Sequence, residues 1–165
     1  MSTCATAPEP GQVVMRTKPG ISKESIDINA LVLNAVKSSR QPVSFLWRES
    51  LTGKVREIYE RCSKAGWDGY DAEPIALESC LGALHVIDLL PDKILPPDAV
   101  PEPAGEISLE WRTEDELLFS LTVTGRTLVY AGIFGGHSKQ HGEEHFFDQL
   151  PKTVLEILTR YFFKG

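Results

Sequence analysis

Hydrophobic and polar residues alternate through the stretch 105–136, and this alternation is the clearest structural pattern in the chain. Apolar residues occupy every second position of 107–111 and again of 119–123, which is the period of a half-buried β-strand. A third apolar run, 128–134, follows a turn at Gly125, where glycine suits a tight hairpin because it adopts positive φ without strain. The pattern predicts a three-stranded antiparallel meander with one buried face and one solvent-facing face.

Apolar residues recur at helical spacing in three other segments, 51–64, 74–90 and 151–163. Five prolines between residues 91 and 103 predict an extended strap with little regular structure, which leads into the meander. The sequence therefore predicts an α+β fold in which a three-stranded antiparallel meander is covered on one face by about three helices. Trp111 is expected to be buried in that interface.

The 165 residues suggest one domain with an N-terminal extension. Residues 1–20 lack periodicity and predict a disordered tail, whereas 21–50 predicts an N-terminal helix and a strap. Within that segment, the short apolar run 43–47 is either an edge strand or a strap on the core. Residues 51–165 form the predicted α+β domain. No apolar run approaches the about 18 residues that span a bilayer, so we expect a cytoplasmic protein without membrane contact.

Charge is distributed unevenly along the chain. Residues 1–66 carry 10 Lys or Arg and 6 Asp or Glu, whereas residues 67–165 carry 7 and 17, giving net charges of +4 and −10. An acidic body repels phosphate backbones and attracts basic protein surfaces, so direct nucleic-acid binding by this body is not expected. The alternative is that the acidic surface only keeps a small domain soluble.

Three histidines at four-residue intervals, His137, His141 and His145, form the most suggestive chemical pattern. On a helix they would share one face and could hold zinc together with a carboxylate. Carboxylates lie close by in the sequence, at Glu143, Glu144 and Asp148. Glycines within and beside the segment make it a poor helix, so the sequence favours a polar loop that binds no metal. A metal site in this loop is the alternative.

The segment 67–74, with the sequence WDGYDAEP, carries three carboxylates, Asp68, Asp71 and Glu73. It lacks the oxygen at every second position and the closing glutamate of a calcium loop. Asp68 followed by glycine instead predicts an Asx turn. The aromatic residues Trp67 and Tyr70 are expected to anchor this loop to the core, or alternatively to be partly exposed and contact a partner.

Three short motifs occur in a fixed order: WDGYDAEP at 67–74, GEISLEW at 105–111 and HGEEHF at 141–146. With the helix and the proline-rich strap between the first two, they resemble the pattern WDGYxAxP, GEISLEW and HGxExF of a broad set of small bacterial proteins of uncharacterised function. The resemblance covers roughly residues 50–165. It implies an α+β domain of bacterial or mobile-element origin and brings no particular activity with it.

Motifs for covalent or phosphate chemistry are missing from the sequence. It contains no GxSxG, SxxK, GxGxxG or GxxxxGK[ST], and its three cysteines form no CxxC pair. Cys62 and Cys80 fall on apolar helix stripes, where cysteine behaves as a small hydrophobe. We therefore predict no cofactor and no nucleophilic catalysis.

Two function classes remain. The first is a non-catalytic cytoplasmic binding module, of inhibitor, antitoxin, immunity or adaptor type, that engages a basic protein partner through an acidic surface. The predicted contact residues are Glu110, Glu114, Asp115, Glu116, Trp67 and Tyr70. The second is a small metal-dependent enzyme that uses the His137, His141 and His145 loop. The charge, the small size and the missing motifs favour the first.

Overall fold

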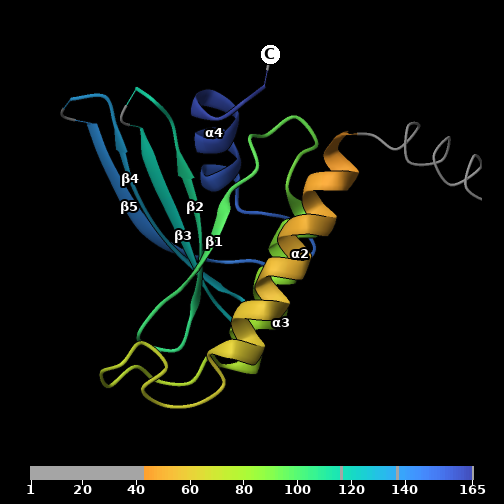
Figure 1. Cartoon of the computed structure of the whole chain (residues 1–165). Helices are drawn as coiled ribbons and strands as arrows, with labels where there is room; N and C mark the ends of the chain where they lie inside the picture. Colours follow the sequence, from red (N-terminus) through yellow and green to blue (C-terminus); the bar gives the residue numbers. More distant parts are fainter. Residues whose placement is uncertain (1–42, 116, 137, 165) are drawn as a thin grey trace, which may run out of the picture. The chain divides into compact units, whose positions relative to one another are not determined.

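The computed structural model describes residues 43–115, 117–136 and 138–164, which all belong to the unit Pro42–Gly165. The regions predicted as a tail and as an N-terminal helix, up to residue 42, lie outside the described residues. The described part forms three helices and five strands (Figure 1). In chain order they are α2 (Val43–Arg61), α3 (Leu77–Leu89), β1 (Asp98–Pro101), β2 (Ile107–Arg112), β3 (Leu118–Thr124), β4 (Thr127–Phe134), β5 (Ser138–His145) and α4 (Lys152–Tyr161).

The sheet is antiparallel and has five strands in the order β1-β2-β3-β4-β5, so the prediction of a three-stranded meander is wrong. The α+β class is confirmed, and β2, β3 and β4 are the predicted strands. β1 was missed because it is a four-residue edge strand in the proline-rich strap, and an edge strand tolerates proline. β5 was missed because its eight residues are polar on both faces and carry no alternating apolar signal.

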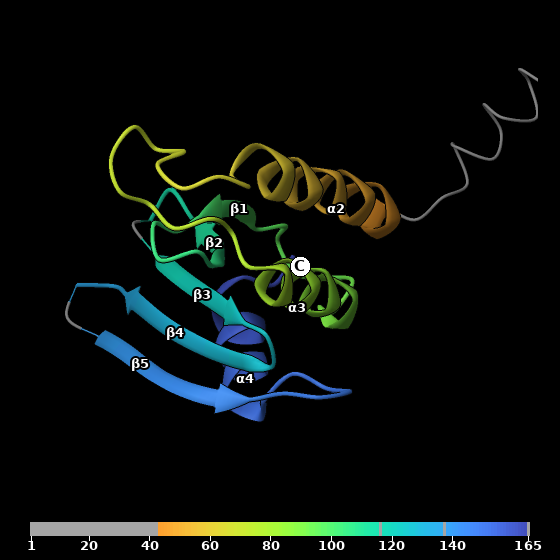
Figure 2. The same ribbon diagram turned by 90° about the horizontal axis from the view of Figure 1, so that it is seen from below.

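The three predicted helices are present, with different bounds. α3 packs on β2 and β3, whereas α2 packs on α3 and β1 (Figure 2). α2 begins at Val43, so the run 43–47 is helical and is neither an edge strand nor a strap. This longer helix brings the Arg48 guanidinium to the C-terminal end of α3, where it donates to the carbonyl oxygens of Ile87 and Leu90. A cation at the end of a helix stabilises such carbonyl groups, which favours the extended α2.

The face of the sheet that the helices cover, here called the covered face, forms the core. Its residues in β2 and β3 are at most 1% exposed: Ile107, Leu109, Trp111, Phe119, Leu121 and Val123. The Trp111 ring lies 5.7 Å from Phe119 and 6.3 Å from Phe162, just after α4, and its Nε1 donates to the Leu95 carbonyl oxygen at 2.8 Å. The predicted buried face and the burial of Trp111 are therefore confirmed.

The loop between α2 and α3 is tied to the start of β2. The backbone N–H of Glu73 donates to the Pro103 carbonyl oxygen, and that of Ala76 donates to the Gly105 carbonyl oxygen, both at 2.8 Å. Gly105 has φ +90°, and a Cβ there would lie 2.8 Å from the Pro74 carbonyl oxygen. The segments WDGYDAEP and GEISLEW, distant in sequence, thus meet in one contact that requires glycine at position 105.

Candidate functional site

The second face of the sheet, here called the open face, points away from the covered face. The strand register aligns its residues in rows that cross β2 to β5. One row holds Ser108, Thr122, Val129 and Glu143; the next holds Glu110, Ser120, Ala131 and His141; the third holds Arg112, Leu118, Ile133 and Lys139. Val129 is 44% exposed and Ile133 is 41% exposed. The open face therefore mixes exposed apolar side chains with charged ones.

A shallow groove of about 260 Å³ crosses β3, β4 and β5 on this side of the sheet. Leu118, Ala131 and Ile133 form its apolar part, and Lys139 and His141 stand on its β5 side. The sequence carried a signal for this groove, because β4 is apolar at both odd and even positions. An apolar run without alternation indicates a strand with apolar side chains on both faces.

Charged side chains of both signs lie on the open face. β2 contributes Glu110 and Arg112, and β5 contributes Lys139 and Glu143. Asp98 of β1 lies opposite Glu110. Beyond β2, Glu114 and Asp115 are exposed in the turn to β3. Glu110 is only partly exposed, and Asp98 forms an ion pair with Lys54 on α2 at 3.2 Å. The exposed acidic groups therefore include Glu114 and Asp115 of the turn, Asp98 of β1 and Glu143 of β5.

The predicted contact residues fall into two groups at opposite ends of β2 (Figure 1). Glu114 and Asp115 follow the end of this six-residue strand, whereas the loop with Trp67 and Tyr70 lies at its start. A strand of this length separates them by about 20 Å. Of the other two acidic candidates, Glu110 lies within β2 and Glu116 lies outside the described residues. The two groups are therefore separated by the length of β2.

The two aromatic residues of the α2–α3 loop behave differently. Trp67 packs on the core cluster, and its Nε1 donates to the Glu73 carbonyl oxygen at 2.8 Å, so it is an anchor of the loop. Tyr70 is 85% exposed, so the prediction that it anchors the loop is wrong. The exposure agrees with the alternative for this residue, and the partner contact of that alternative stays a prediction. The side chain of Asp68 accepts the N–H of Tyr70 at 2.9 Å, which confirms the Asx turn.

The histidines of the metal hypothesis lie on a strand. The segment expected to be a polar loop is β5, because its backbone pairs along the whole of β4. His141 and His145 are four residues apart on one side of this strand, which separates their Cα atoms by about 13 Å. Zinc needs ligand nitrogens within about 2.1 Å, so these two imidazoles cannot share one ion in this geometry.

His145 is engaged elsewhere, since its Nδ1 lies 3.0 Å from the Thr127 hydroxyl oxygen. Among the described residues, no three His, Cys, Asp or Glu side chains are placed to hold a metal ion. His137, the third member of the motif, lies outside the described residues.

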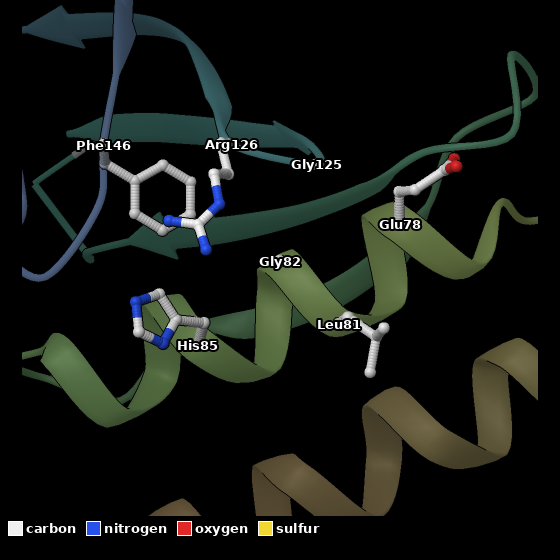
Figure 3. Close-up of a pocket in the computed structure, with 7 residues that line it drawn as sticks. All are labelled: Glu78, Leu81, Gly82, His85, Gly125, Arg126 and Phe146. Carbon is white, nitrogen blue, oxygen red and sulfur yellow. The ribbon is translucent and has the colours of Figure 1, made fainter.

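A second cavity of about 300 Å³ lies between α3, the β3–β4 turn and the end of β5 (Figure 3). The His85 ring stacks on Phe146 at 5.7 Å, and its Nε2 lies 2.6 Å from the Phe147 carbonyl oxygen, which requires a proton on Nε2. Figure 3 shows the Arg126 guanidinium beside Phe146, while the Glu78 carboxylate points away at the other end. No acid and base converge here. This cavity was not predictable from the sequence, because separate elements supply its walls.

Two buried side chains have shifted pKa values. Burial raises the pKa of the Cys80 thiol, and the nearby Arg56 partly opposes this. Burial raises the pKa of Tyr130, and the charge of Glu144 and its hydrogen bond to the phenol raise it further. A thiol with a raised pKa is a poor nucleophile, and Tyr130 belongs to the core cluster. The shift of the Cys80 pKa therefore comes from burial, and that of the Tyr130 pKa from burial together with Glu144.

Comparisons with known proteins identify no relative. A scan against protein-family models, a search of curated proteins and a search of solved structures each found no match to this chain. Among the described residues, no helix has the length and apolar character needed to cross a membrane. The geometry of the two faces is therefore the basis for the proposed function.

Proposed function

We propose that the protein is a non-catalytic binding module, of inhibitor, antitoxin, immunity or adaptor type, which acts in the cytoplasm on a protein partner. In this proposal the partner contacts the open face and the acidic turn with Glu114 and Asp115. The supporting observation is that Val129 and Ile133 are 44% and 41% exposed on this face. Exposed apolar side chains surrounded by polar ones are typical of protein interfaces.

Charge supports a basic surface on the partner. Residues 67–165 carry a net charge of −10, which disfavours direct binding of nucleic acid by this part of the chain. Glu114 and Asp115 are exposed in a turn where packing does not require acidic residues. The resemblance of the three motifs to small bacterial proteins is consistent with a bacterial or mobile-element origin.

The test begins with affinity capture from the native host, identification of the captured protein, and its purification. Binding is then compared for wild type and for the variant Glu114→Lys/Asp115→Lys over a range of salt concentrations. The matched control is Glu49→Lys/Glu60→Lys, which changes the net charge equally at exposed positions of α2. We expect slower association and weaker salt dependence only for the turn variant, because long-range attraction depends on the local field. Equal binding by the turn and control variants would refute the proposal.

The metal-dependent enzyme is the alternative, and it has its own test. Metal content is measured in dialysed protein, together with the stability of the fold in chelator. We expect less than about 0.1 equivalent of transition metal and an unchanged unfolding midpoint, because a structural zinc contributes to folding directly. Close to one equivalent, lost together with the fold, would favour the enzyme over the binding module.

A further inference from the structure

Within the described residues, β5 is the accessible edge of the sheet. In Figures 1 and 2 no described element lies beyond it. The other edge, β1, has only four residues, ends at Pro101, and packs against α2, whose Lys54 pairs with Asp98. β5 is twice as long, with eight residues, most of them exposed. An edge of this length can accept another strand.

The register shows which backbone groups of β5 are free to pair. The Phe146 N–H donates to the Arg126 carbonyl oxygen at 3.0 Å, directly after the aligned pair Thr127 and His145. Hydrogen-bonded pairs alternate in an antiparallel ladder, so the even-numbered residues of β5 bond to β4. The backbone N–H and C=O groups of the odd-numbered residues therefore point outward, at Lys139, His141, Glu143 and His145.

The charges of β5 are ordered along the strand. Lys139 lies in its first half, whereas Glu143 and Glu144 lie in its second half. We propose that two copies of this chain pair through β5 in an antiparallel, two-fold symmetric arrangement centred on His141. With His141 at the two-fold axis, Lys139 of each copy lies opposite Glu143 of the other. Both residues are among those whose backbone groups point outward. Two complementary charge pairs and a continuous ten-stranded sheet result.

Charged residues on an edge strand ordinarily prevent pairing with unrelated strands. The charges of β5 should likewise disfavour pairing with most other strands, because like charges directly opposite each other destabilise a strand pair. Its own sequence in antiparallel orientation is complementary, so the same charges select a second copy. The test of the dimer measures mass alone, so it can fail separately from the proposed partner binding. Lys139 and His141 also line the groove on the open face, whereas the acidic turn adjoins β2 and β3.

The first test measures the mass of the full chain in solution as a function of concentration. Wild type is expected to dimerise, and Lys139→Glu or Glu143→Lys alone should weaken dimerisation about tenfold or more, because each creates two like-charge contacts. The double variant Lys139→Glu/Glu143→Lys restores both pairs and should dimerise like wild type. A monomeric wild type up to about 1 mM, or single and double variants that behave alike, would overturn the proposal.

The second test blocks the backbone. His141→Pro removes an outward-pointing N–H, and proline is tolerated where the N–H of an edge strand faces solvent. The matched control, His141→Thr, keeps the N–H and the strand preference. We expect a folded monomer for the proline variant, judged by its circular dichroism and unfolding midpoint, and a dimer for the control. A folded proline variant that dimerises like the control would show that another surface pairs.

Discussion

The covered and open faces of the sheet share the same strands and differ in what their side chains do. Leu121 on the covered face is fully buried, whereas Ser120 beside it is partly exposed and lines the groove. On the covered face aromatic and aliphatic side chains interlock with the helices. On the open face, Val129 and Ile133 are exposed among polar and charged neighbours. The stability of the fold should therefore depend on the covered face, and recognition of a partner on the open face.

A substitution on the open face can therefore alter partner binding while the next residue of the strand, on the covered face, still contributes to the free energy of unfolding. The separation holds because successive side chains of a strand point to opposite faces. The separation can be tested by making the same substitution on each face of the sheet. It can also be tested by making the same substitution in α3, which packs on the sheet, and in α2.

The largest expected effect is at Leu121. Leu121→Ala leaves a cavity in the core, and we expect the free energy of unfolding to fall by about 2 to 5 kcal/mol. Ser120→Ala, one residue away on the open face, should change it by less than about 0.5 kcal/mol. Denaturant unfolding measures both. An unchanged midpoint for Leu121→Ala would show that the wrong face has been assigned to the core.

A smaller loss is expected at Gly82 in α3. A Cβ there would lie 2.3 Å from the Gly125 backbone oxygen and 2.8 Å from a Val123 methyl carbon. Gly82→Ala should therefore destabilise by about 1 to 3 kcal/mol, despite the better helix propensity of alanine.

Gly53 in α2 is the matched control, because a Cβ there meets nothing within 4 Å. Gly53→Ala should stabilise by about 0.5 to 1 kcal/mol. Thermal or denaturant unfolding distinguishes the two. Effects of the same sign would mean that α3 does not pack on the β3–β4 turn as described.

The third test places one substitution on both faces. Val123 is fully buried and Val129 is 44% exposed. Val123→Thr buries a hydroxyl group in the core and should cost about 1 to 3 kcal/mol, whereas Val129→Thr should stay within about 0.5 kcal/mol. Partner affinity should show the reverse order, with the loss at Val129. Equal stability changes for the two variants would contradict the two-face description.

The smallest effect is an alkaline pH dependence from Tyr130. Because its pKa is raised in the folded state, the unfolded chain loses this proton first, and stability falls as pH rises above about 10. Tyr130→Phe should show a smaller alkaline fall than wild type. Tyr70→Phe, at an 85% exposed tyrosine, is the control and should follow wild type. Identical pH profiles for all three proteins would argue against a buried, neutral Tyr130.

The alternation in 107–111 and 119–123 was sufficient to predict two central strands and their buried face. A sheet that buries one face requires an apolar side chain at every second position, and this requirement is visible locally. The turn at Gly125, with φ +59°, was predictable for the same reason, because its conformation depends on its own residue type. The three described helices were predictable from their apolar stripes, although α2 begins at Val43 rather than at residue 51.

The secondary structure of the polar segments depends on tertiary contacts alone. β5 has no apolar alternation and is a strand because β4 offers it a full row of backbone hydrogen bonds. That pairing sets the distance between His141 and His145 at about 13 Å, where a helix would place them about 6 Å apart. It also aligns β5 next to the apolar residues of β4 on the open face. Four-residue spacing in the sequence is compatible with both outcomes, because the distance it implies depends on long-range backbone pairing.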